Sequence, residues 1–273
     1  MAQSDPIATP PRVTVLGVPL DENSSFLRGP ALAPARIRAA LRAGSMNLVT
    51  EDGVDLGERA DWRDAGDLAL GTGDAAIADI EREMARVLAT GSRVLSLGGD
   101  HSITAPILRA VAAIHPNLTI LHFDAHPDLY DEFEGSRRSH ACPFARIMEE
   151  GLAARLVQVG IRAMNPHQRQ QAERFGVEVI AMRDYHPGLA LDLQGPVYVS
   201  LDLDALDPAF APGVSHHEPG GLSVRDVLRL LAGVEAPIIG ADIVEYNPIR
   251  DHAEMTAMVA VKFYKELVGR MLR

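Results

Sequence analysis

The segment Leu121–Asp128 reads Leu-His-Phe-Asp-Ala-His-Pro-Asp and joins an apolar strand to several potential metal ligands. Successive side chains of a strand alternate between its two faces, so Asp124 and His126 can point the same way. Asp128 follows Pro127, a residue at which a strand is expected to leave its sheet. The segment therefore predicts a buried strand whose carboxyl end carries functional side chains.

Similar apolar runs alternate with helical patterns along the 273 residues of the chain. The alternation predicts an α/β fold, a parallel sheet with helices on both faces. The expected strands are Val13–Val18, Arg93–Leu97, Leu118–Phe123, Leu156–Ile161, Val177–Met182, Val197–Leu203 and Pro237–Val244. The expected helices are Ala35–Leu41, Ala75–Leu88, Ile103–Ile114, Phe144–Leu156, His167–Phe175, Val224–Leu231 and Met255–Leu272. Residues 44–74 are interpreted as an irregular loop, and since no linker divides the chain, we expect one domain over residues 1–273.

Two further expected strands end in residues of the same kind. Gly98–Ser102 reads Gly-Gly-Asp-His-Ser, and Ser200–Asp204 reads Ser-Leu-Asp-Leu-Asp. Ligands of parallel sheets bind beyond the carboxyl ends of the strands, so the three runs are expected to meet. The candidate metal ligands are His101, Asp124, His126, Asp128, Asp202 and Asp204. Capping or turn roles are the alternative for any single run, but they do not account for buried, unpaired aspartates in apolar strands.

The donor set indicates the kind of metal. Four carboxylates and two imidazoles suit two divalent cations that share one site. Oxygen and imidazole donors without sulfur favour manganese, magnesium or iron, with zinc and cobalt as alternatives. Two cations held about 3.5–4 Å apart make hydroxide available at neutral pH. The three runs therefore predict a hydrolytic metal centre.

Two residues outside these runs are candidates for substrate chemistry. His140 follows the loop after Asp128; it either shuttles protons near neutral pH or is an exposed loop histidine. Glu245 ends an apolar strand just before Asn247-Pro248. Its carboxylate either holds a cationic group of the substrate or lies in a surface turn.

The loop after Asp128 also carries Ser136 and Arg137, beside Arg138. A guanidinium there can pair bidentately with a substrate carboxylate, so both Ser136 and Arg137 are candidate substrate contacts. The alternative is that the arginines are solvated or lie at a subunit interface. Cys142 is not expected to be a nucleophile, because no flanking pattern of a cysteine hydrolase surrounds it.

The remaining histidines are given lesser roles. His122 lies one strand step before Asp124 and is expected to pack behind the ligands. His216 and His217 follow Pro212-Gly213 and are interpreted as rim residues or bystanders.

Charge and composition exclude several classes of partner. The net charge is −11, from 26 basic and 37 acidic residues, and no basic stripe indicates nucleic-acid binding. No stretch approaches the roughly 20 apolar residues of a membrane span. A single cysteine fits a reducing compartment, and no signal-peptide pattern is recognised at the N-terminus. The expectation is a cytoplasmic enzyme.

The three ligand runs, in this order and spacing, resemble the metal signatures of the ureohydrolase family, which contains arginases and agmatinases. The resemblance extends to Gly29-Pro30, to the segment Asp207–Gly213 and to Glu245 with Asn247-Pro248. Asn23–Leu27 and other segments are most similar to the plant-type arginase branch. The resemblance implies a three-layer α/β/α sandwich with an eight-stranded parallel sheet, two manganese ions and a homo-oligomer, a trimer or hexamer.

The resemblance also implies roles for individual residues. His101 and Asp128 would bind one manganese, His126 and Asp204 the other, and Asp124 and Asp202 would bridge the two. His140 matches the proton-shuttling histidine of the family, and Glu245 matches the glutamate that pairs with the guanidinium. Asp128 would also assist proton transfer to the leaving amine.

The implied reaction is hydrolysis of a guanidino compound to urea and an amine. L-Arginine, which would yield ornithine, is the expected substrate, with agmatine and 4-guanidinobutyrate as alternatives. An acetylpolyamine-type deacetylase with one zinc is a more distant alternative, as are a phosphoesterase and a non-catalytic protein. The complete ligand set argues against the last.

Overall fold

The computed structural model describes residues 11–273. Within that part, eight strands form one sheet in the order β2-β1-β3-β8-β7-β4-β5-β6, and every neighbouring pair is parallel. The strands are β1 Val13–Val18, β2 Trp62–Asp67, β3 Arg93–Gly98, β4 Thr119–Phe123, β5 Arg155–Ile161, β6 Glu178–Ala181, β7 Val197–Asp202 and β8 Ile238–Val244. The helices are α1 Ala33–Arg42, α2 Asp74–Leu88, α3 Thr104–Ala112, α4 Pro143–Glu149, α5 Pro166–Phe175, α6 Val224–Ala232 and α7 Met255–Met271. The predicted α/β class and the eight-stranded parallel sheet are confirmed.

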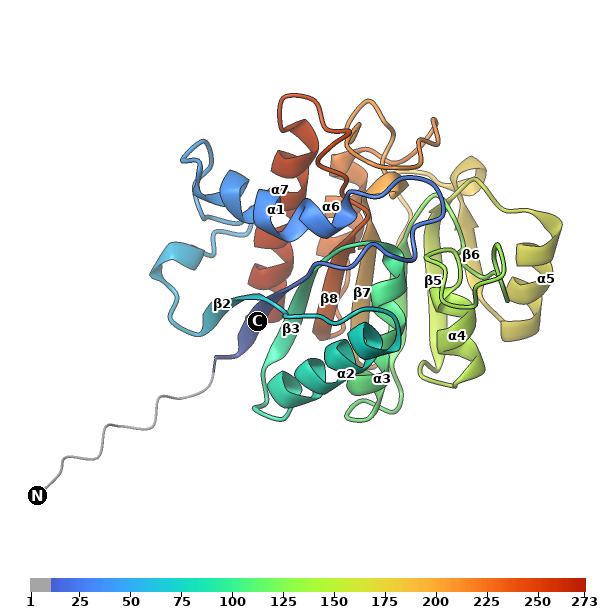
Figure 1. Cartoon of the computed structure of the whole chain (residues 1–273). Coiled ribbons are helices and arrows are strands. Elements are labelled where there is room, and N and C mark those ends of the chain that lie inside the picture. The colour runs from blue at the N-terminus through green and yellow to red at the C-terminus, as the bar shows by residue number, and fades with distance from the viewer. Residues whose placement is uncertain (1–10) are drawn as a thin grey trace, which may run out of the picture.

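Helices cover both faces of the sheet and give the molecule three layers (Figure 1). On one face, Ile37 of α1, Val227 of α6 and Val261 of α7 share a hydrophobic core with the strands. On the other face, Ile80 of α2 and Leu108 of α3 belong to a second core, which α4 and α5 extend. The strands are buried on both sides, which explains why their sequences are apolar without alternation.

The order of the strands brings the functional runs together. Strands β3, β8, β7 and β4 are consecutive in the middle of the sheet, although far apart in the chain. Their registers align Leu97 with Ile243 and Asp202 with Val244, so their carboxyl ends lie level. Every predicted metal ligand and Glu245 follow one of these four strands, or end it, at this edge.

The edge strand β2 was not predicted, because the segment was interpreted as a loop. Its sequence is Trp-Arg-Asp-Ala-Gly-Asp, and its residues are partly or largely exposed, so it carries no apolar run. It is stabilised by the largely buried Arg38 of α1, whose guanidinium donates to both carboxylate oxygens of Asp64, to Asp67 and to the carbonyl of Gly66. A strand held by ion pairs rather than by apolar burial has no signal in hydrophobic periodicity.

Two helices are shorter than predicted. The expected helix over residues 144–156 ends at Glu149, because Gly151 takes a positive φ of 65° and the chain then enters β5 at Arg155. The helix expected from Ile103 begins at Thr104 and is preceded by a 3-10 turn over His101–Ile103. That turn places His101 directly beyond β3.

Candidate metal centre

His101 lies at the centre of a group of buried carboxylates. Its Nδ1 atom is 3.2 Å from Asp124 Oδ2, 3.1 Å from Asp128 Oδ2 and 3.2 Å from Asp202 Oδ2. The imidazole is fully buried, and Nδ1 has no hydrogen-bond partner among residues 11–273. A ring nitrogen that faces three carboxylate oxygens requires a proton or a metal ion among them.

The contacts of Nε2, on the opposite edge of the His101 ring, show whether a proton or a metal ion is favoured at Nδ1. Nε2 lies 3.0 Å from the hydroxyl of Ser200, and that hydroxyl donates to Asp242 Oδ1 at 2.7 Å. Since the hydroxyl proton is directed to Asp242, Ser200 accepts the proton of Nε2, and the neutral ring presents its lone pair at Nδ1. This orientation suits metal coordination. Asp242 itself was missed by sequence reasoning, although an aspartate within the apolar strand β8 was a usable signal.

The second half of the group is built around His126. Its Nδ1 atom is 3.0 Å from Asp204 Oδ2 and 3.4 Å from Asp124 Oδ1. The two oxygens of Asp124 therefore face different imidazoles. Backbone amides fix these carboxylates: His126 donates to Asp124 at 2.6 Å, and Asp204 donates to Asp202 at 2.7 Å. The arrangement has two imidazole-centred halves that share Asp124.

The group carries more negative charge than the chain compensates. Over residues 11–273, no lysine or arginine forms an ion pair with Asp124, Asp128, Asp202 or Asp204. Burial, followed by the neighbouring carboxylates of Asp204 and Asp124, raises the pKa of Asp202 well above its usual range. Divalent cations would relieve this repulsion, so the donors, their burial and their spacing fit a metal centre.

His122 lies next to the group but is oriented as a supporting residue. The amide of Gln158 donates to His122 Nδ1 at 3.0 Å and to the carbonyl of Pro127 at 2.7 Å. The proton of His122 is therefore on Nε2, which donates to Asp124 Oδ2 at 2.8 Å. The ring also stacks on Phe144, with centroids 3.9 Å apart. As expected from the sequence, His122 packs behind the ligands.

Glu245 connects the group of candidate metal ligands to His140. Its Oε1 atom accepts from the backbone amide of His101 and from His140 Nδ1, both at 2.8 Å. Burial alone would lower the pKa of His140, but the Glu245 carboxylate outweighs it and raises the pKa to about 9. Glu245 Oε2 is buried and has no hydrogen-bond partner in the part of the chain that the structure describes. Glu245 and Asp128 both take positive φ angles, 63° and 51°, and such strained residues cluster at functional sites.

A loop between β1 and α1 holds the other side of His140. Ser25 Oγ lies 2.8 Å from His140 Nε2, and the His140 amide donates to the carbonyl of Asn23. Asp100 fixes this loop by accepting from the Asn23 amide at 3.0 Å and from the Ser24 hydroxyl at 3.2 Å. Asp100 also caps the turn over His101–Ile103, because it accepts from the Ser102 amide. One buried carboxylate therefore ties the His101 turn to the loop that orients His140.

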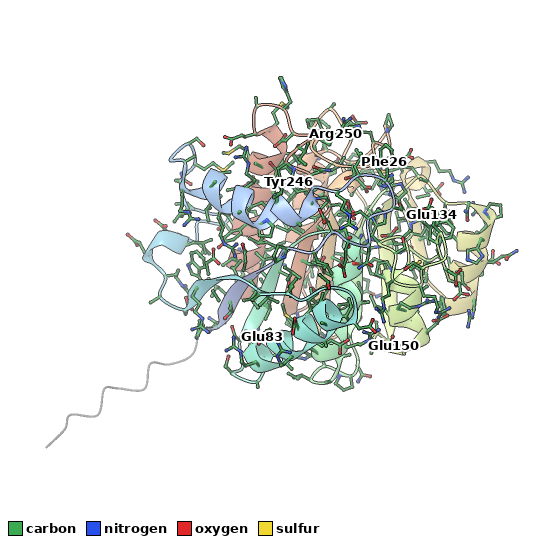
Figure 2. The ribbon with its side chains drawn as sticks, viewed as in Figure 1. Phe26, Glu83, Glu134, Glu150, Tyr246 and Arg250 are labelled. Atoms are coloured by element: carbon green, nitrogen blue, oxygen red, sulfur yellow. The ribbon has the colours of Figure 1, made fainter. Side chains whose placement is uncertain are left out.

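Four of the candidate ligands line the floor of a pocket of about 490 Å³; they are His126, Asp128, Asp202 and Asp204. Its walls are made by the loops that follow β4, β5 and β7 and by the Ser25 loop. The lining residues include Tyr130, Phe133, Met164, Asn165, Gln168, Arg162, His216 and Glu218, together with His140 and Glu245. His216 lies between His126 and His140, with ring centroids 5.8 and 5.4 Å away, so it is part of the wall, whereas His217 is exposed. The ring of Phe26 lies next to that of His216, with centroids 5.6 Å apart. Phe26 and Glu134 are both labelled in Figure 2.

Ser136 and Arg137 are not brought to this pocket. Arg137 pairs with Asp131 at 2.5 Å and with Glu149 at 2.8 Å, and it lines a separate hollow. The hydroxyl of Ser136 accepts from the amide of Arg138 within the same loop. The loop leaves β4 beside the site, but its turn directs these two residues away from it.

Cys142 is buried next to this loop. Burial, followed by the nearby Asp128 carboxylate, raises the pKa of the thiol to about 12. Such a thiol carries almost no thiolate at neutral pH, in agreement with its expected lack of a nucleophilic role.

The fold and the carboxylate-imidazole centre define a metal-dependent hydrolase of the α/β class. A family model described as "Arginase family" matches residues 11–269. The chain is 49% identical to "Arginase 1, mitochondrial" of Arabidopsis thaliana, over 94% of this chain and 80% of that protein. It is 41% identical to the N(1)-aminopropylagmatine ureohydrolase of Thermus thermophilus, over 90% of this chain and 86% of that protein.

A solved structure supports the same assignment. The arginase from Medicago truncatula superposes with a TM-score of 0.89 at 46% identity, over 95% of this chain and 87% of that one. The chain therefore belongs to the arginase family, whose members are metalloenzymes that hydrolyse C–N bonds of guanidino compounds. The resemblance inferred from the sequence is confirmed.

The prediction of a cytoplasmic location is wrong by the same comparisons. The Arabidopsis relatives are named as mitochondrial or chloroplastic enzymes, and a rice relative as mitochondrial. A low cysteine content indicates only a reducing compartment, which does not distinguish an organelle interior from the cytoplasm. Among residues 11–273, no helix has both the length and the apolar character that crossing a bilayer requires.

Proposed function

We propose that this chain is a manganese-dependent ureohydrolase that converts L-arginine and water to ornithine and urea. The observation that carries the proposal is the unpartnered Nδ1 atom of His101 among three carboxylates. The backbone amide of the same residue donates to Glu245. The names of the Arabidopsis and Medicago relatives support arginine as the substrate. The Thermus relative makes a guanidino polyamine such as agmatine the alternative.

The donors suit two cations. His101 and Asp128 would hold one, His126 and Asp204 the other, and Asp124 and Asp202 would be shared, as the oxygens of Asp124 facing both imidazoles support. Two bound manganese ions would supply a hydroxide nucleophile near neutral pH and stabilise developing negative charge.

Glu245 would place the guanidinium over this centre. Its free Oε2 atom can accept N–H groups from the substrate, while Oε1 is held by His101 and His140. A carboxylate fixed from two sides leaves little freedom in the position of the guanidinium carbon. Such positioning contributes several kcal/mol to catalysis.

The leaving amine must gain a proton when the C–N bond breaks. Asp128, whose Oδ2 atom is 3.1 Å from His101 Nδ1, would carry the proton released by the attacking water to that amine. His140 would restore protons to the site, because Nδ1 contacts Glu245 while Nε2 contacts the hydroxyl of Ser25 at the pocket wall. One water is consumed, and both of its protons remain in the products.

A urea-release assay on the manganese-loaded chain tests the proposal, with arginine, agmatine and 4-guanidinobutyrate as substrates. We expect urea from arginine and two manganese ions per chain by elemental analysis. No urea from any of these substrates, or one tightly bound zinc per chain with deacetylase activity, would overturn it.

The single domain over residues 1–273 and the trimer or hexamer stay predictions. One cooperative unfolding transition and light scattering coupled to size-exclusion chromatography test them.

A further inference from the structure

The charges that line the pocket are distributed unevenly. Near the floor, the carboxylates contact imidazoles, and Glu245 also contacts His140. Besides the candidate ligands, the histidines and Glu245, the only charged lining residues over residues 11–273 are Arg162 and Glu218. Other lining residues are neutral: Asn165 donates to the hydroxyl of Tyr130 at 2.6 Å, and Met164 and Gln168 also line the pocket.

Arg162 has no donor left for a substrate. Its Nε and Nη2 atoms donate to the carbonyl of Glu218, at 2.8 and 2.6 Å. Its remaining hydrogen bonds reach the carbonyls of Gly160, Ala205, Asp204 and Leu206. A guanidinium carries five N–H groups, and here every nitrogen faces main-chain carbonyls. Arg162 is thus unable to pair bidentately with a substrate carboxylate.

The same contacts fix Glu218 relative to the metal centre. Arg162 Nη2 donates both to Glu218 and to Asp204, a candidate ligand, at 2.6 and 2.7 Å. The main chain of Glu218 is therefore held near the end of β7. Its side chain is 42% exposed, and its Oε1 atom lies 4.0 Å from His126 Nε2, too far for a hydrogen bond. Among the residues the structure describes, no lysine or arginine pairs with this carboxylate.

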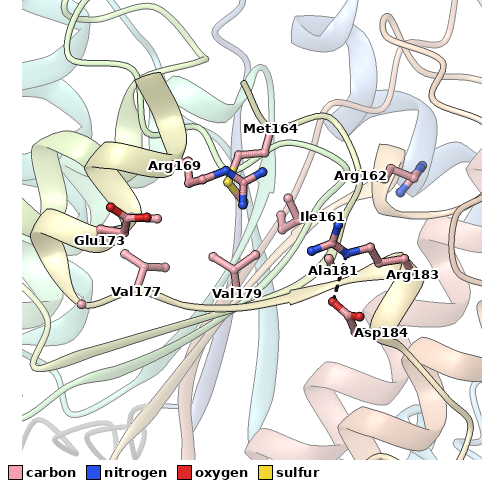
Figure 3. Close-up of a pocket in the computed structure, with 12 residues that line it drawn as sticks. Ile161, Arg162, Met164, Arg169, Glu173, Val177, Val179, Ala181, Arg183 and Asp184 are labelled. Atoms are coloured by element: carbon pink, nitrogen blue, oxygen red, sulfur yellow. Dashed lines mark hydrogen bonds and ion pairs between the residues drawn. The ribbon is translucent and has the colours of Figure 1, made fainter. Parts of the chain in front are cut away.

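Other arginines near the site face elsewhere. Arg137 and Arg138 pair with acidic residues of the surface and line a separate hollow. Arg169 and Arg183 lie in a neighbouring hollow of about 500 Å³ between α5 and the edge of the sheet (Figure 3). Among the described residues that line the metal pocket, Glu218 is therefore a carboxylate without a lysine or arginine partner, and no cationic side chain is free to pair with a substrate.

We propose that Glu218, held in place by Arg162, is a specificity residue that binds the ammonium group at the far end of the substrate. The site then accepts guanidino compounds with a distal amine, such as arginine and agmatine. It discriminates against those whose distal end is only a carboxylate, because that group would face Glu218 and find no cation. This inference rests on the proposed function and names the part of the substrate that the pocket recognises.

Steady-state kinetics of Glu218→Gln test it. Because the carboxylate is partly exposed, we expect KM for arginine and agmatine to rise about fivefold while kcat stays within about twofold. KM for 4-guanidinobutyrate is expected to stay constant or fall, since the repelling charge is removed. The matched control is Glu134→Gln, which removes one exposed negative charge beside the pocket without altering its lining.

Two further measurements separate recognition from a structural role. Manganese content should be the same in Glu218→Gln and in the parent, and binding of ornithine by calorimetry should weaken by a similar factor. Arg162→Gln should raise KM for both amine substrates as well, because Glu218 loses its anchor. Glu218→Asp, which keeps the negative charge, should give KM values between those of Glu218→Gln and the parent.

The outcomes distinguish this inference from the proposed function. A parent enzyme that releases urea from arginine, with a Glu218→Gln variant whose KM is unchanged or changes equally for all three substrates, overturns the inference alone. Loss of manganese in that variant overturns it too, because Glu218 would then act through His126. A parent that releases no urea from any guanidino substrate overturns both.

Discussion

Two regions of the molecule bury charge in opposite ways. At the edge strand β2, the buried guanidinium of Arg38 is surrounded by Asp64 and Asp67, so the chain supplies both signs of charge. At the ends of β4 and β7, four aspartates are buried around His101 and His126 with no lysine or arginine paired to them over residues 11–273. Burying an unpaired charge is costly, so the first region is complete by itself and the second requires a ligand.

Whether a buried charge is structural or functional depends on whether the chain itself supplies the opposite charge. Aspartates in close contact with a nitrogen-bearing side chain occur in both kinds of region, and their presence alone does not identify a site. The balance of charge within the chain does. Where the balance is kept, we expect variants to affect stability; where it is not, we expect effects on ligand binding and activity.

The largest effect is expected at the uncompensated region, from Asp202→Asn. Activity should fall about 10³-fold or more, comparable to the loss of a main source of charge stabilisation, and manganese content should fall with it. The metal-free variant should be about 1 kcal/mol more stable than the metal-free parent, because one of several repelling carboxylates is removed. Urea release, elemental analysis and urea denaturation measure the three quantities. A less stable metal-free variant would contradict the comparison.

The compensated region should respond in the opposite way to Arg38→Met. The free energy of unfolding should fall by about 2–4 kcal/mol, since Asp64 and Asp67 lose their buried partner. Manganese content and kcat of the surviving folded protein should not change. The control is Arg36→Met in the same helix, whose exposed pair with Glu254 should contribute no more than about 0.5 kcal/mol. Loss of bound metal in the Arg38 variant would show that the two regions are coupled.

The contact between His140 and Glu245 predicts a dependence of stability on pH. The folded pKa of His140 is raised from 6.5 to about 9, so the contact stabilises the fold fully below the unfolded value, and its contribution disappears as pH rises through about 9. Metal-free parent and His140→Asn should therefore differ by about 3 kcal/mol in unfolding free energy near pH 6, and by little near pH 10. Denaturation curves at both pH values measure this difference. A difference that grows with pH would reverse the assignment.

The smallest effect is expected where compensated charges are exposed. A hydrogen bond from Arg225 lowers the pKa of Glu51 to about 2. The lowered pKa makes this contact stabilising above the unfolded value of 4.5, and the contribution is lost as pH falls through about 2. Because water screens both side chains, Arg225→Ala should leave the free energy of unfolding at neutral pH nearly unchanged in denaturation curves. A loss of stability as large as that of Arg38→Met would show that exposure does not govern the comparison.

Sequence reasoning found the parts of the site that lie in short runs. Asp124 and His126 follow one strand, and Asp202 and Asp204 follow another, so each pair could be placed from period and position alone. The hydrogen bonds that orient His101 were missed. They run through Ser200 to Asp242, and these two residues become neighbours only when β7 and β8 pair. Glu218 was missed for the same reason, because it reaches the pocket through a long loop; His216, from the same loop, was interpreted only as a rim residue or bystander.

Arg137 shows that a residue close to a site in sequence need not belong to it. It lies nine residues after Asp128, yet its guanidinium pairs with Asp131 and Glu149 outside the pocket. Glu245, more than a hundred residues away from Asp128, lies at the same edge of the sheet and in the pocket. Direction of the side chain, rather than distance in sequence, decides membership of a site.

The sequence by itself determined the α/β class and the residue types at the strand ends, because apolar runs and turn residues act locally. The tertiary structure alone decided that β3, β8, β7 and β4 are neighbours, that the ring of His101 presents Nδ1 to three carboxylates, and that Glu218 remains free while Arg162 does not. These features depend on strand order and on hydrogen bonds between distant segments, which form only when the sheet assembles.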